Sequence, residues 1–447
     1  MNDYQDQLET ALRQTGVTGA SWAYWDGETL HKAVAGLRNS RTQDPVTTDT
    51  LMHIGSITKI FNTTLLMQLV DEGKVVLEDP VGKYLPELRL GDMDALGRIT
   101  CGMLVNHTSG IDGDVLPDHG PDQERVADAI ARCAGLGQLH PPGEAASYCN
   151  IATVIAGYLS QELAGESWYT LVKTRIFEPL GMEHALADLT DLPRFRCSVG
   201  DLRNPATGEM VQTTRPFLPL SFAPAGATLM MSAADLVTFA RAFPTGVGAN
   251  GVRILSEASA RRMVTGTAGL LSPPWQIGLG WMILPGNMIS HGGGGPGVVS
   301  SLYAHPESGR VLALLTNCDL PDPLKPFVVD PILESWTGQV PNESLVSPTA
   351  VTPFDAKAYA GTYENNMFKL DIIAEAGNPV ARFSTKARIY DTSGEGELCA
   401  MSPIGEHAFK IAAMLGGRDA EVKFANPDDQ GRMQAIGVMA RLFVRTA

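Results

Sequence analysis

Apolar residues recur at helical spacing in the segment that follows residue 58. The run consists of Ile60, Phe61, Leu65, Leu66, Leu69 and Val70, and it ends at Asp71-Glu72-Gly73. Spacings of three and four residues place side chains on one face of a helix, and a glycine after the last periodic residue is a common stop signal. The pattern predicts a helix that begins near Ser56 and ends at Gly73.

Alternating, strand-like runs flank a long helical region. Residues 18–36 read as two strands around the turn Trp25-Asp26-Gly27-Glu28, which predicts a hairpin. From about 56 to 245 the pattern is helical, with a helix over 150–163 and a capping box at Ser232 and Asp235. Alternation returns at 278–284, 298–303 and 311–316. This order predicts one sheet built from both ends of a domain, with helices inserted between.

The composition changes near residue 338. Residues 338–354 begin at Gly338 and contain three prolines, Pro341, Pro348 and Pro353, which is typical of a linker. Short alternating runs follow at the spacing of an antiparallel barrel or sandwich, at 368–373, 380–385, 408–411, 421–424 and 437–444. We therefore expect an α+β domain over residues 1–337, a linker over 338–354 and a small all-β domain over 355–447.

The charge of the chain argues against two classes of partner. Its 447 residues carry a formal net charge of −15, whereas nucleic acids and anionic membranes are bound through basic patches. The segment 1–7 lacks the basic and apolar regions of a signal peptide, and no apolar run is long enough to span a bilayer. We expect a cytoplasmic protein that binds neither nucleic acid nor membrane, with no indication of its oligomeric state.

The cysteine and histidine patterns indicate no metal and no disulfide framework. The six cysteines, at positions 101, 133, 149, 197, 318 and 399, form no C-x-x-C pair, and the nine histidines show no H-E-x-x-H arrangement. We expect buried, reduced thiols and no metal or other cofactor.

Ser56 and Lys59 lie one helical turn apart at the start of the predicted helix. Residues i and i+3 share a helix face. A serine hydroxyl needs a nearby base, and a lysine can serve when desolvation lowers its pKa enough to leave the amine neutral. The spacing alone also fits an unrelated surface pair, so the interpretation as an acyl-transfer centre depends on further motifs.

Tyr148 and Asn150 follow a turn signal at 141–144 and precede an apolar helix. A phenol whose pKa is lowered by a neighbouring ammonium can carry a proton between nucleophile and leaving group, and an asparagine can bind a substrate carbonyl. Taken alone, Tyr148 also fits a packing role.

Four consecutive glycines follow His291, after a strand that ends near Ile289. Glycine lets the backbone approach a ligand closely, and an N–H group there can complete an oxyanion hole with the N–H of Ser56. A hairpin turn is the alternative. A nucleotide cradle fits less well, because a phosphate loop precedes a helix and here a strand-like run follows. His291 can orient a group or donate a proton, and its ordinary pKa near 6.5 predicts a charge that depends on pH.

Five motifs in this order resemble the serine β-lactamase and penicillin-binding-protein superfamily, over about residues 8–337. They are Ser56-x-x-Lys59, Asn106-His107-Thr108-Ser109-Gly110, Pro142-Gly143 before Tyr148-x-Asn150, Gly278-Leu279-Gly280-Trp281, and His291-Gly292-Gly293. The nearest branch is class C-like, with family VIII carboxylesterases, D-aminopeptidases, D-amino-acid amidases and penicillin-binding-protein-type thioesterases. The segment 359–364 is similar to the start of lipocalin-like β-barrels appended to many members.

The resemblance implies a role for each motif residue. Ser56 would be the acylated nucleophile, Lys59 its base or proton partner, Tyr148 the general base in deacylation, and Asn150 a ligand of substrate and lysine. His291 would stand at the third motif, with Gly293 beside Gly294, whose N–H would complete the oxyanion hole. True class C β-lactamases carry Lys-Thr-Gly where this chain has His291-Gly292-Gly293, so efficient penicillin hydrolysis is not expected. Cys149 replaces the usual serine as a tolerated small residue.

We therefore expect a serine hydrolase that acts on an ester or an amide through an acyl-enzyme, as a carboxylesterase or a D-type peptidase or amidase. A peptide-cyclising thioesterase and a weak β-lactamase are alternatives within this class. A sensor that is acylated without turnover, or a scaffold that kept the fold, is the alternative outside it.

Overall fold

The larger part of the protein is built on one antiparallel sheet. The computed structural model describes residues 2–114, 126–204, 207–319, 323–341, 355–375, 378–386, 394–415 and 418–447. In the described residues the sheet has nine strands in the order β3-β2-β1-β14-β13-β12-β11-β10-β9. They are β1 (Gly19–Trp25), β2 (Leu30–Asn39), β3 (Asp44–Pro45), β9 (Ala268–Gly269), β10 (Gln276–Ile277), β11 (Met282–Leu284), β12 (Met288–Gly295), β13 (Val298–His305) and β14 (Arg310–Thr316). The pairing of β1 with β14 confirms a sheet built from both ends of the domain.

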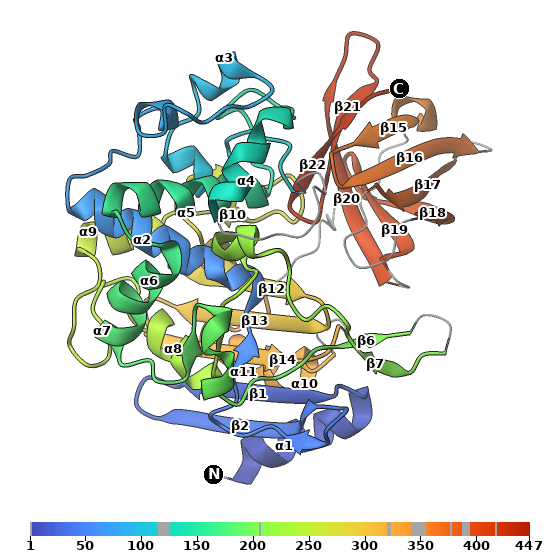
Figure 1. Cartoon of the computed structure of the whole chain (residues 1–447). Helices are drawn as coiled ribbons and strands as arrows, with labels where there is room; N and C mark the ends of the chain where they lie inside the picture. Colours follow the sequence, from blue (N-terminus) through green and yellow to red (C-terminus); the bar gives the residue numbers. More distant parts are fainter. Residues whose placement is uncertain are drawn as a thin grey trace.

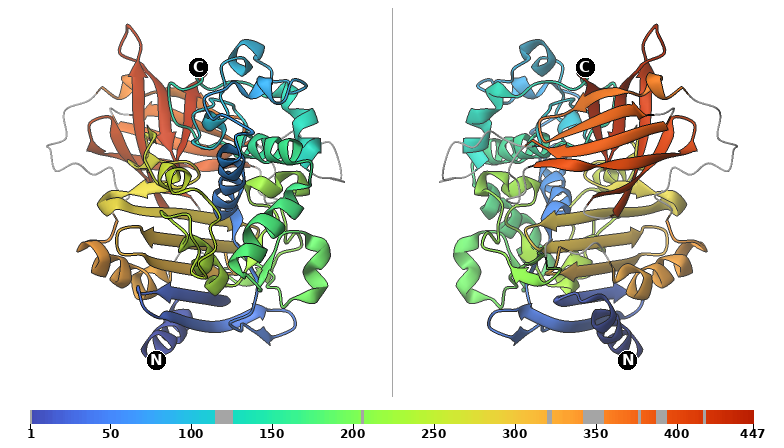
Figure 2. Two further views of the ribbon diagram at one scale, coloured as in Figure 1. Left: turned by 90° about the vertical axis from the view of Figure 1, so that its left-hand side faces the viewer. Right: turned by 90° about the vertical axis from the view of Figure 1, so that its right-hand side faces the viewer.

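Helices cover both faces of this sheet (Figures 1 and 2). On β1, Trp22 and Tyr24 face a cluster shared with α1 (Asn2–Thr15), α10 (Lys325–Val328) and α11 (Asp330–Thr337). Ala23, between them, faces the main core. Alternation with a period of two thus divides the side chains of one strand between two layers.

The main core lies between the sheet and the helical layer. Its helices are α2 (Thr58–Asp71), α3 (Met93–Leu96), α4 (Val126–Arg132), α5 (Asn150–Ala164), α6 (Trp168–Val172), α7 (Glu178–Leu180), α8 (Ala233–Ala240) and α9 (Glu257–Met263). Short strands complete it: β4 (Met52–His53), β5 (Ala185–Leu186) and β8 (Met230–Met231) form one small sheet, and β6 (Asp201–Arg203) pairs with β7 (Met210–Gln212). The predicted capping box at Ser232 is half formed. Ser232 accepts from the N–H of Asp235, but the Asp235 carboxylate accepts from the N–H of His184.

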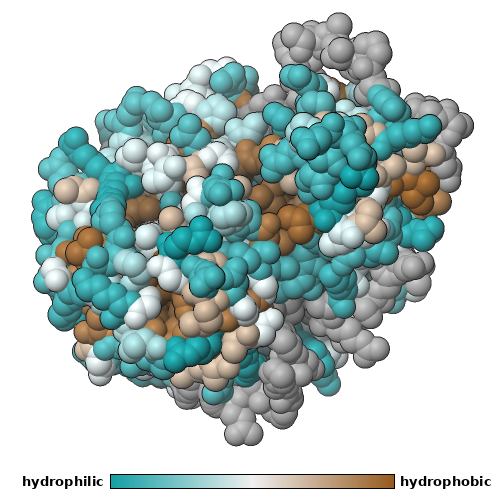
Figure 3. All heavy atoms as spheres, turned by 90° about the horizontal axis from the view of Figure 1, so that it is seen from above, coloured by the Kyte–Doolittle hydropathy of each residue, from teal (hydrophilic) through white to brown (hydrophobic). Residues whose placement is uncertain are grey.

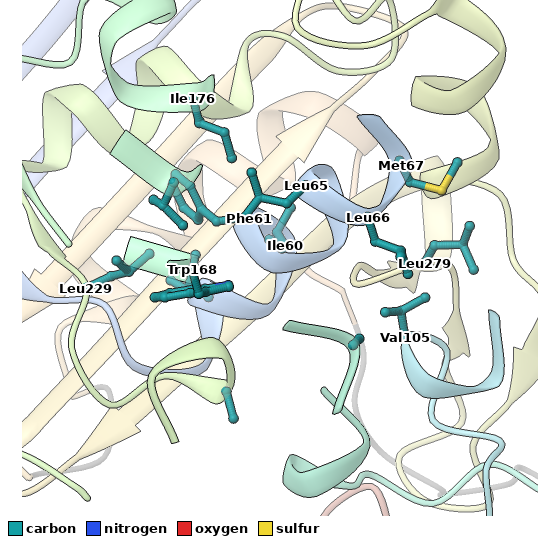
Figure 4. Close-up of a cluster of buried hydrophobic side chains, with 14 of the residues drawn as sticks. Ile60, Phe61, Leu65, Leu66, Met67, Val105, Trp168, Ile176, Leu229 and Leu279 are labelled. Atoms are coloured by element: carbon teal, nitrogen blue, oxygen red, sulfur yellow. The ribbon is translucent and has the colours of Figure 1, made fainter. Parts of the chain in front are cut away.

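Helix α2 runs through the centre of this core and is buried on nearly every face, as Figure 4 shows. The sequence predicts that α2 has a single apolar face, because its apolar residues recur at helical spacing and polar residues lie between them. Three of those polar residues form hydrogen bonds inside the protein: Thr63 and Thr64 donate to carbonyls one turn earlier, and Asn62 accepts from the indole N–H of Trp168 and donates to the carbonyl of Thr153. A buried polar group is tolerated when it is hydrogen-bonded. This position places the start of α2 deep in the protein.

The C-terminal part is a closed antiparallel barrel of eight strands, seen at the upper right of Figure 1. The strands are β15 (Gly361–Glu364), β16 (Phe368–Glu375), β17 (Asn378–Thr385), β18 (Gly394–Gly405), β19 (Ala408–Leu415), β20 (Arg418–Pro427), β21 (Met433–Val438) and β22 (Arg441–Arg445). Aromatic side chains such as Phe409, Phe424 and Phe443 fill its interior. The all-β prediction is confirmed, and residues 342–354 of the predicted linker lie outside the described residues.

One predicted run of the barrel is wrong. The alternation over 437–444 contains the turn of a hairpin, with Met439 and Ala440 both at positive φ (51° and 63°). Neither residue is a glycine or an asparagine, so the sequence carried no turn signal there.

Two further properties bear on function. No helix among the described residues is long and apolar enough to cross a bilayer. Each of the six cysteines is a free thiol, and Cys101, Cys133, Cys149 and Cys318 are buried.

Candidate active site

Ser56 sits in a tight turn, Gly55–Ile57, that leads directly into α2. The turn is held from three sides. His53 accepts from the N–H of Gly55 through Nδ1 (3.0 Å) and approaches the carbonyl of Ala227 through Nε2 (3.0 Å), and Ser300 of β13 donates to the carbonyl of Ile54 (2.8 Å). A candidate nucleophile on such a turn would be held in place before substrate arrives.

Lys59 is completely enclosed, with its side chain directed at Ser56. Its Nζ lies 3.2 Å from Ser56 Oγ and 2.6 Å from the carbonyl oxygen of Ala225. Burial is the main cause that lowers the pKa of Lys59 to about 7, and the Arg441 guanidinium adds to it, while Asp114 and Cys149 oppose the shift. An amine with this pKa is about half neutral at neutral pH. The neutral form can accept the proton of the Ser56 hydroxyl.

Tyr148 lies on the other side of Ser56, just before α5. Its phenol makes a side-chain hydrogen bond with Ser56, and Lys59 Nζ lies 4.8 Å from the centre of its ring. Burial raises the pKa of Tyr148, and this effect exceeds the lowering by the Ser56 hydrogen bond and by Arg441. The expectation of a phenol acidified by a neighbouring ammonium is therefore wrong. Tyr148 is a neutral phenol, which can accept one proton and donate another without becoming a phenolate.

The side-chain amide of Asn150 donates to Asp114 Oδ1 (3.1 Å), and its role as a ligand of substrate and of Lys59 stays a prediction. Its neighbour Cys149 caps α5, accepting from the N–H of Ala152 (3.4 Å). Burial raises the pKa of Cys149 to about 12. The thiol thus serves as a small capping residue and not as a second nucleophile.

The glycines after His291 lie within strand β12, and the turn of the hairpin falls later, at Pro296-Gly297. A Cβ atom on Gly293 would lie 1.9 Å from the carbonyl oxygen of Ile54, and one on Gly55 would lie 2.5 Å from the N atom of Gly294. The strand therefore needs glycine because the Ser56 turn packs directly on its backbone. This packing brings Gly294 beside the turn that carries Ser56.

His291 is buried and neutral. Its Nδ1 lies 2.6 Å from the carbonyl of Gly292, which makes Nδ1 the protonated nitrogen, and Nε2 has no hydrogen-bond partner among the described residues. Burial, aided by Lys59, lowers the pKa of His291 to about 3. The expected pH-dependent charge is therefore wrong: above about pH 4 this position offers only a neutral acceptor.

His107, from the second motif, packs its ring on Tyr148 at 4.5 Å. It accepts from the N–H of Cys149 through Nδ1 (3.2 Å), which places its proton on Nε2. Burial is the main cause that lowers its pKa well below the usual value. Both imidazoles of the site are thus uncharged at neutral pH.

Three residues that contact the site, Ala225, Asp114 and Arg441, were not predicted from the sequence. The carbonyl of Ala225 holds Lys59, and Asp114 pairs with Arg441, whose guanidinium lies 4.8 Å from the ring centre of Tyr148. Neither Asp114 nor Arg441 lies in a motif that points to catalysis, and only folding brings β22, near the end of the chain, to this place. Among the described residues, no group of three or more His, Cys, Asp or Glu side chains is arranged to hold a metal ion.

Comparison with known proteins gives two matches that cover most of this chain. The family described as Beta-lactamase matches residues 5–330. "Penicillin-binding protein 4" of Amycolatopsis lactamdurans is 33% identical over 372 residues, which cover 81% of this chain and 97% of that protein.

Solved structures extend the likeness to the barrel. SurE superposes with a TM-score of 0.79 at 25% identity, covering 100% of this chain and 98% of SurE, and its complex with D-Leu gives a TM-score of 0.77 at 25% identity, covering 100% and 99%. The D-amino acid amidase from Ochrobactrum anthropi SV3, complexed with L-phenylalanine amide, gives a TM-score of 0.61 at 25% identity over 71% of this chain and 90% of the amidase.

Proposed function

This chain belongs to the beta-lactamase family, and on that basis we propose that it is a serine hydrolase that cleaves an ester or amide bond through an acyl-enzyme on Ser56. The observation that carries the proposal is the buried cluster in which Ser56 Oγ meets both the Lys59 amine and the Tyr148 phenol. A nucleophile within hydrogen-bond reach of its base is the arrangement that covalent catalysis requires.

Acylation begins with proton transfer from Ser56 to the neutral amine of Lys59. Ser56 Oγ then forms a bond to the substrate carbonyl carbon, and the carbonyl oxygen becomes an oxyanion. The N–H groups of Ser56 and Gly294 are the proposed donors to this oxyanion, and the packing of the Gly55 turn on Gly294 supports their proximity. Gly293 contributes because it has no side chain, which leaves room for the backbone of Ile54 before the Ser56 turn.

Collapse of the tetrahedral intermediate expels an alcohol, amine or thiol. Tyr148 donates its hydroxyl proton to the leaving atom and takes a proton from the Lys59 ammonium, which returns both groups to their neutral forms. In deacylation the same relay runs from an attacking water through Tyr148 to Lys59. A neutral phenol with a raised pKa suits such a relay, because no step leaves a phenolate in the buried site.

We propose that the acyl group ends in a D-configured residue. The relatives whose structures carry this interpretation are an amidase for D-amino acids and SurE, which was solved with D-Leu. Apolar side chains gather on the surface where the helical part meets the barrel, near the middle of Figure 3, and such a surface suits an apolar acyl chain.

A β-lactam substrate is disfavoured by charge. His291 is neutral where β-lactamases hold a lysine, and the guanidinium of Arg441 is already paired with Asp114. A substrate carboxylate would therefore meet no unpaired cation among these residues.

The test is a rate panel with p-nitrophenyl acetate, D-leucyl and L-leucyl p-nitroanilides, a peptidyl thioester ending in D-Leu, and nitrocefin. The proposal predicts sustained turnover, a preference for the D over the L anilide, and slow nitrocefin hydrolysis. All of this activity should disappear in Ser56→Ala, while Ser308→Ala, at an exposed turn serine, should match the wild type.

The panel also separates the alternatives. A preference for the L anilide would reject the D-configured acyl group, and activity confined to p-nitrophenyl acetate would indicate a carboxylesterase. Release of a cyclic product from the thioester would indicate a thioesterase in which an amine replaces water. A single burst without turnover would indicate a sensor and contradict the proposed hydrolase.

A further inference from the structure

The barrel is bonded directly to the segment that carries the proposed catalytic tyrosine. The N–H of Tyr148 donates to the carbonyl of Ala440 (2.8 Å), and the N–H of Leu442 donates to Ser147 Oγ (3.0 Å). The N–H of Ala440 donates in turn to the carbonyl of Ser272 (2.8 Å). The β21–β22 hairpin therefore ends inside the active-site wall, held through both polar groups of Ala440.

The hairpin has an unusual backbone at this point. Met439 and Ala440 both have positive φ, a conformation that is unfavourable for non-glycine residues and persists where the surroundings impose it. Here the surroundings are the two-residue turn of the β21–β22 hairpin, which favours positive φ at both positions, and the bonds of Ala440 to Tyr148 and Ser272. A second contact, from the N–H of Asn366 to Asp112 Oδ1 (2.9 Å), ties the β15–β16 connection to the loop that carries Asp114.

Arg441 is the first residue after this turn, and its side chain reaches the catalytic centre. Its Nε bonds Asp114 Oδ2, its Nη2 lies 3.4 Å from Asp114 Oδ1, and its Nη1 donates to the carbonyl of Met439 (3.1 Å). Asp114 Oδ1 also accepts from the amide of Asn150. The guanidinium thus connects the hairpin, the ring of Tyr148 and, through Asp114, Asn150.

We propose that Arg441 is a positioning residue that the barrel supplies to the Ser56 centre, where it orients Tyr148 directly and Asn150 through Asp114. This inference rests on the proposed function of that centre. It gives the barrel a specific role in catalysis, because the site is complete only while the β21–β22 hairpin is docked.

The ion pair between Arg441 and Asp114 also affects the pKa of Lys59. The groups that face Lys59 are Ser56, Tyr148, His107, His291 and Cys149, together with the pair itself. The Arg441 charge favours the neutral amine, and the Asp114 charge favours the ammonium. Removing one partner therefore leaves the other uncompensated in a buried place, and the two removals act on Lys59 in opposite directions.

The test uses the full-length chain with three substitutions. Arg441→Gln should move the acidic limb of the kcat/KM profile to higher pH by roughly half a unit or more, and Asp114→Asn should move it to lower pH by a similar amount. Arg441→Lys keeps the charge without the planar fork, so it should restore the pH limb but not the full kcat. Arg432→Gln, an exposed barrel arginine paired with Asp428, is the matched control and should behave as wild type.

The outcomes are distinct from those that test the hydrolase itself. Opposite shifts from Arg441→Gln and Asp114→Asn support the inference, even if kcat falls in both. Shifts in one common direction, or wild-type profiles for both variants while Ser56→Ala is inactive, would overturn the role of Arg441 and leave the proposed function intact. Activity that persists in Ser56→Ala would instead reject the proposed function.

Discussion

The buried amine of Lys59 gives the most quantitative prediction. With an ordinary pKa near 10.4, only about 4 in 10,000 lysine side chains are neutral at pH 7, whereas a pKa of about 7 leaves about half of them neutral. Burial therefore raises the fraction of Lys59 that is neutral at pH 7, and so able to accept a proton, roughly a thousandfold. We expect the rate of acylation to fall about tenfold for each pH unit below 7 and to level off above pH 8.

The same shift makes a prediction about stability, with its sign fixed by proton binding. Between pH 7 and 10 the unfolded chain binds a proton at Lys59 and the folded protein does not, so the free energy of unfolding rises with pH. For the pKa of about 7, the contribution rises by about 2 kcal/mol between pH 7 and pH 9. Lys59→Met should lose this rise.

Two assays check these values. Stopped-flow bursts with p-nitrophenyl acetate give the acylation rate from pH 5.5 to 9, and urea unfolding of wild type and Lys59→Met gives the difference in free energy at pH 7, 8 and 9. Lys357→Met, at an exposed lysine just before the first barrel strand, controls for the loss of a lysine in general. An acidic limb centred near pH 10, or a free-energy difference that stays constant from pH 7 to 9, would refute a neutral Lys59.

Three further substitutions test the rest of the site. Tyr148→Phe should slow deacylation by about a hundred- to ten-thousandfold and turn steady turnover into a visible burst; equal loss in both steps would contradict the relay. His291→Lys adds a cation beside the site and should improve capture of carboxylate substrates such as penicillins, whereas the wild-type preference between nitrocefin and p-nitrophenyl acetate should not change between pH 5.5 and 8 as it would if His291 titrated there. Gly293→Ala should abolish activity by pushing Ile54 and the Ser56 turn aside, while Gly309→Ala, at a turn with open space, should keep activity at some cost in stability.

The sequence predicted most of the fold because hydrophobic periodicity records local structure. The first hairpin, α2, α5 and the strands β13 and β14 all follow from spacing. The sequence placed the end of strand β12 near Ile289, because the four glycines that follow carry no alternation of side chains, whereas the strand continues to Gly295. Gly293 makes room for Ile54, which lies far earlier in the chain, and no local pattern records such a contact.

The sequence predicted those residues of the candidate site that lie in motifs. Ser56, Lys59, Tyr148, His291 and the glycine strand do meet in space, yet their protonation states depend on burial, which spacing does not report. The raised pKa of Tyr148 and the lowered pKa of His291 both follow from enclosure. Arg441 was invisible for a similar reason, since its importance comes from the docking of the barrel and not from its neighbours in sequence.

The most direct test of the central claim is the identity of the acylated residue. The enzyme is mixed with a D-leucyl ester or a peptidyl thioester ending in D-Leu, quenched in acid within milliseconds and digested for peptide mass spectrometry, with Tyr148→Phe used to accumulate the intermediate. The account predicts one acyl adduct, on Ser56, that forms and decays at rates consistent with turnover. An adduct on another residue, or turnover by Tyr148→Phe with no covalent adduct at any time, would contradict it.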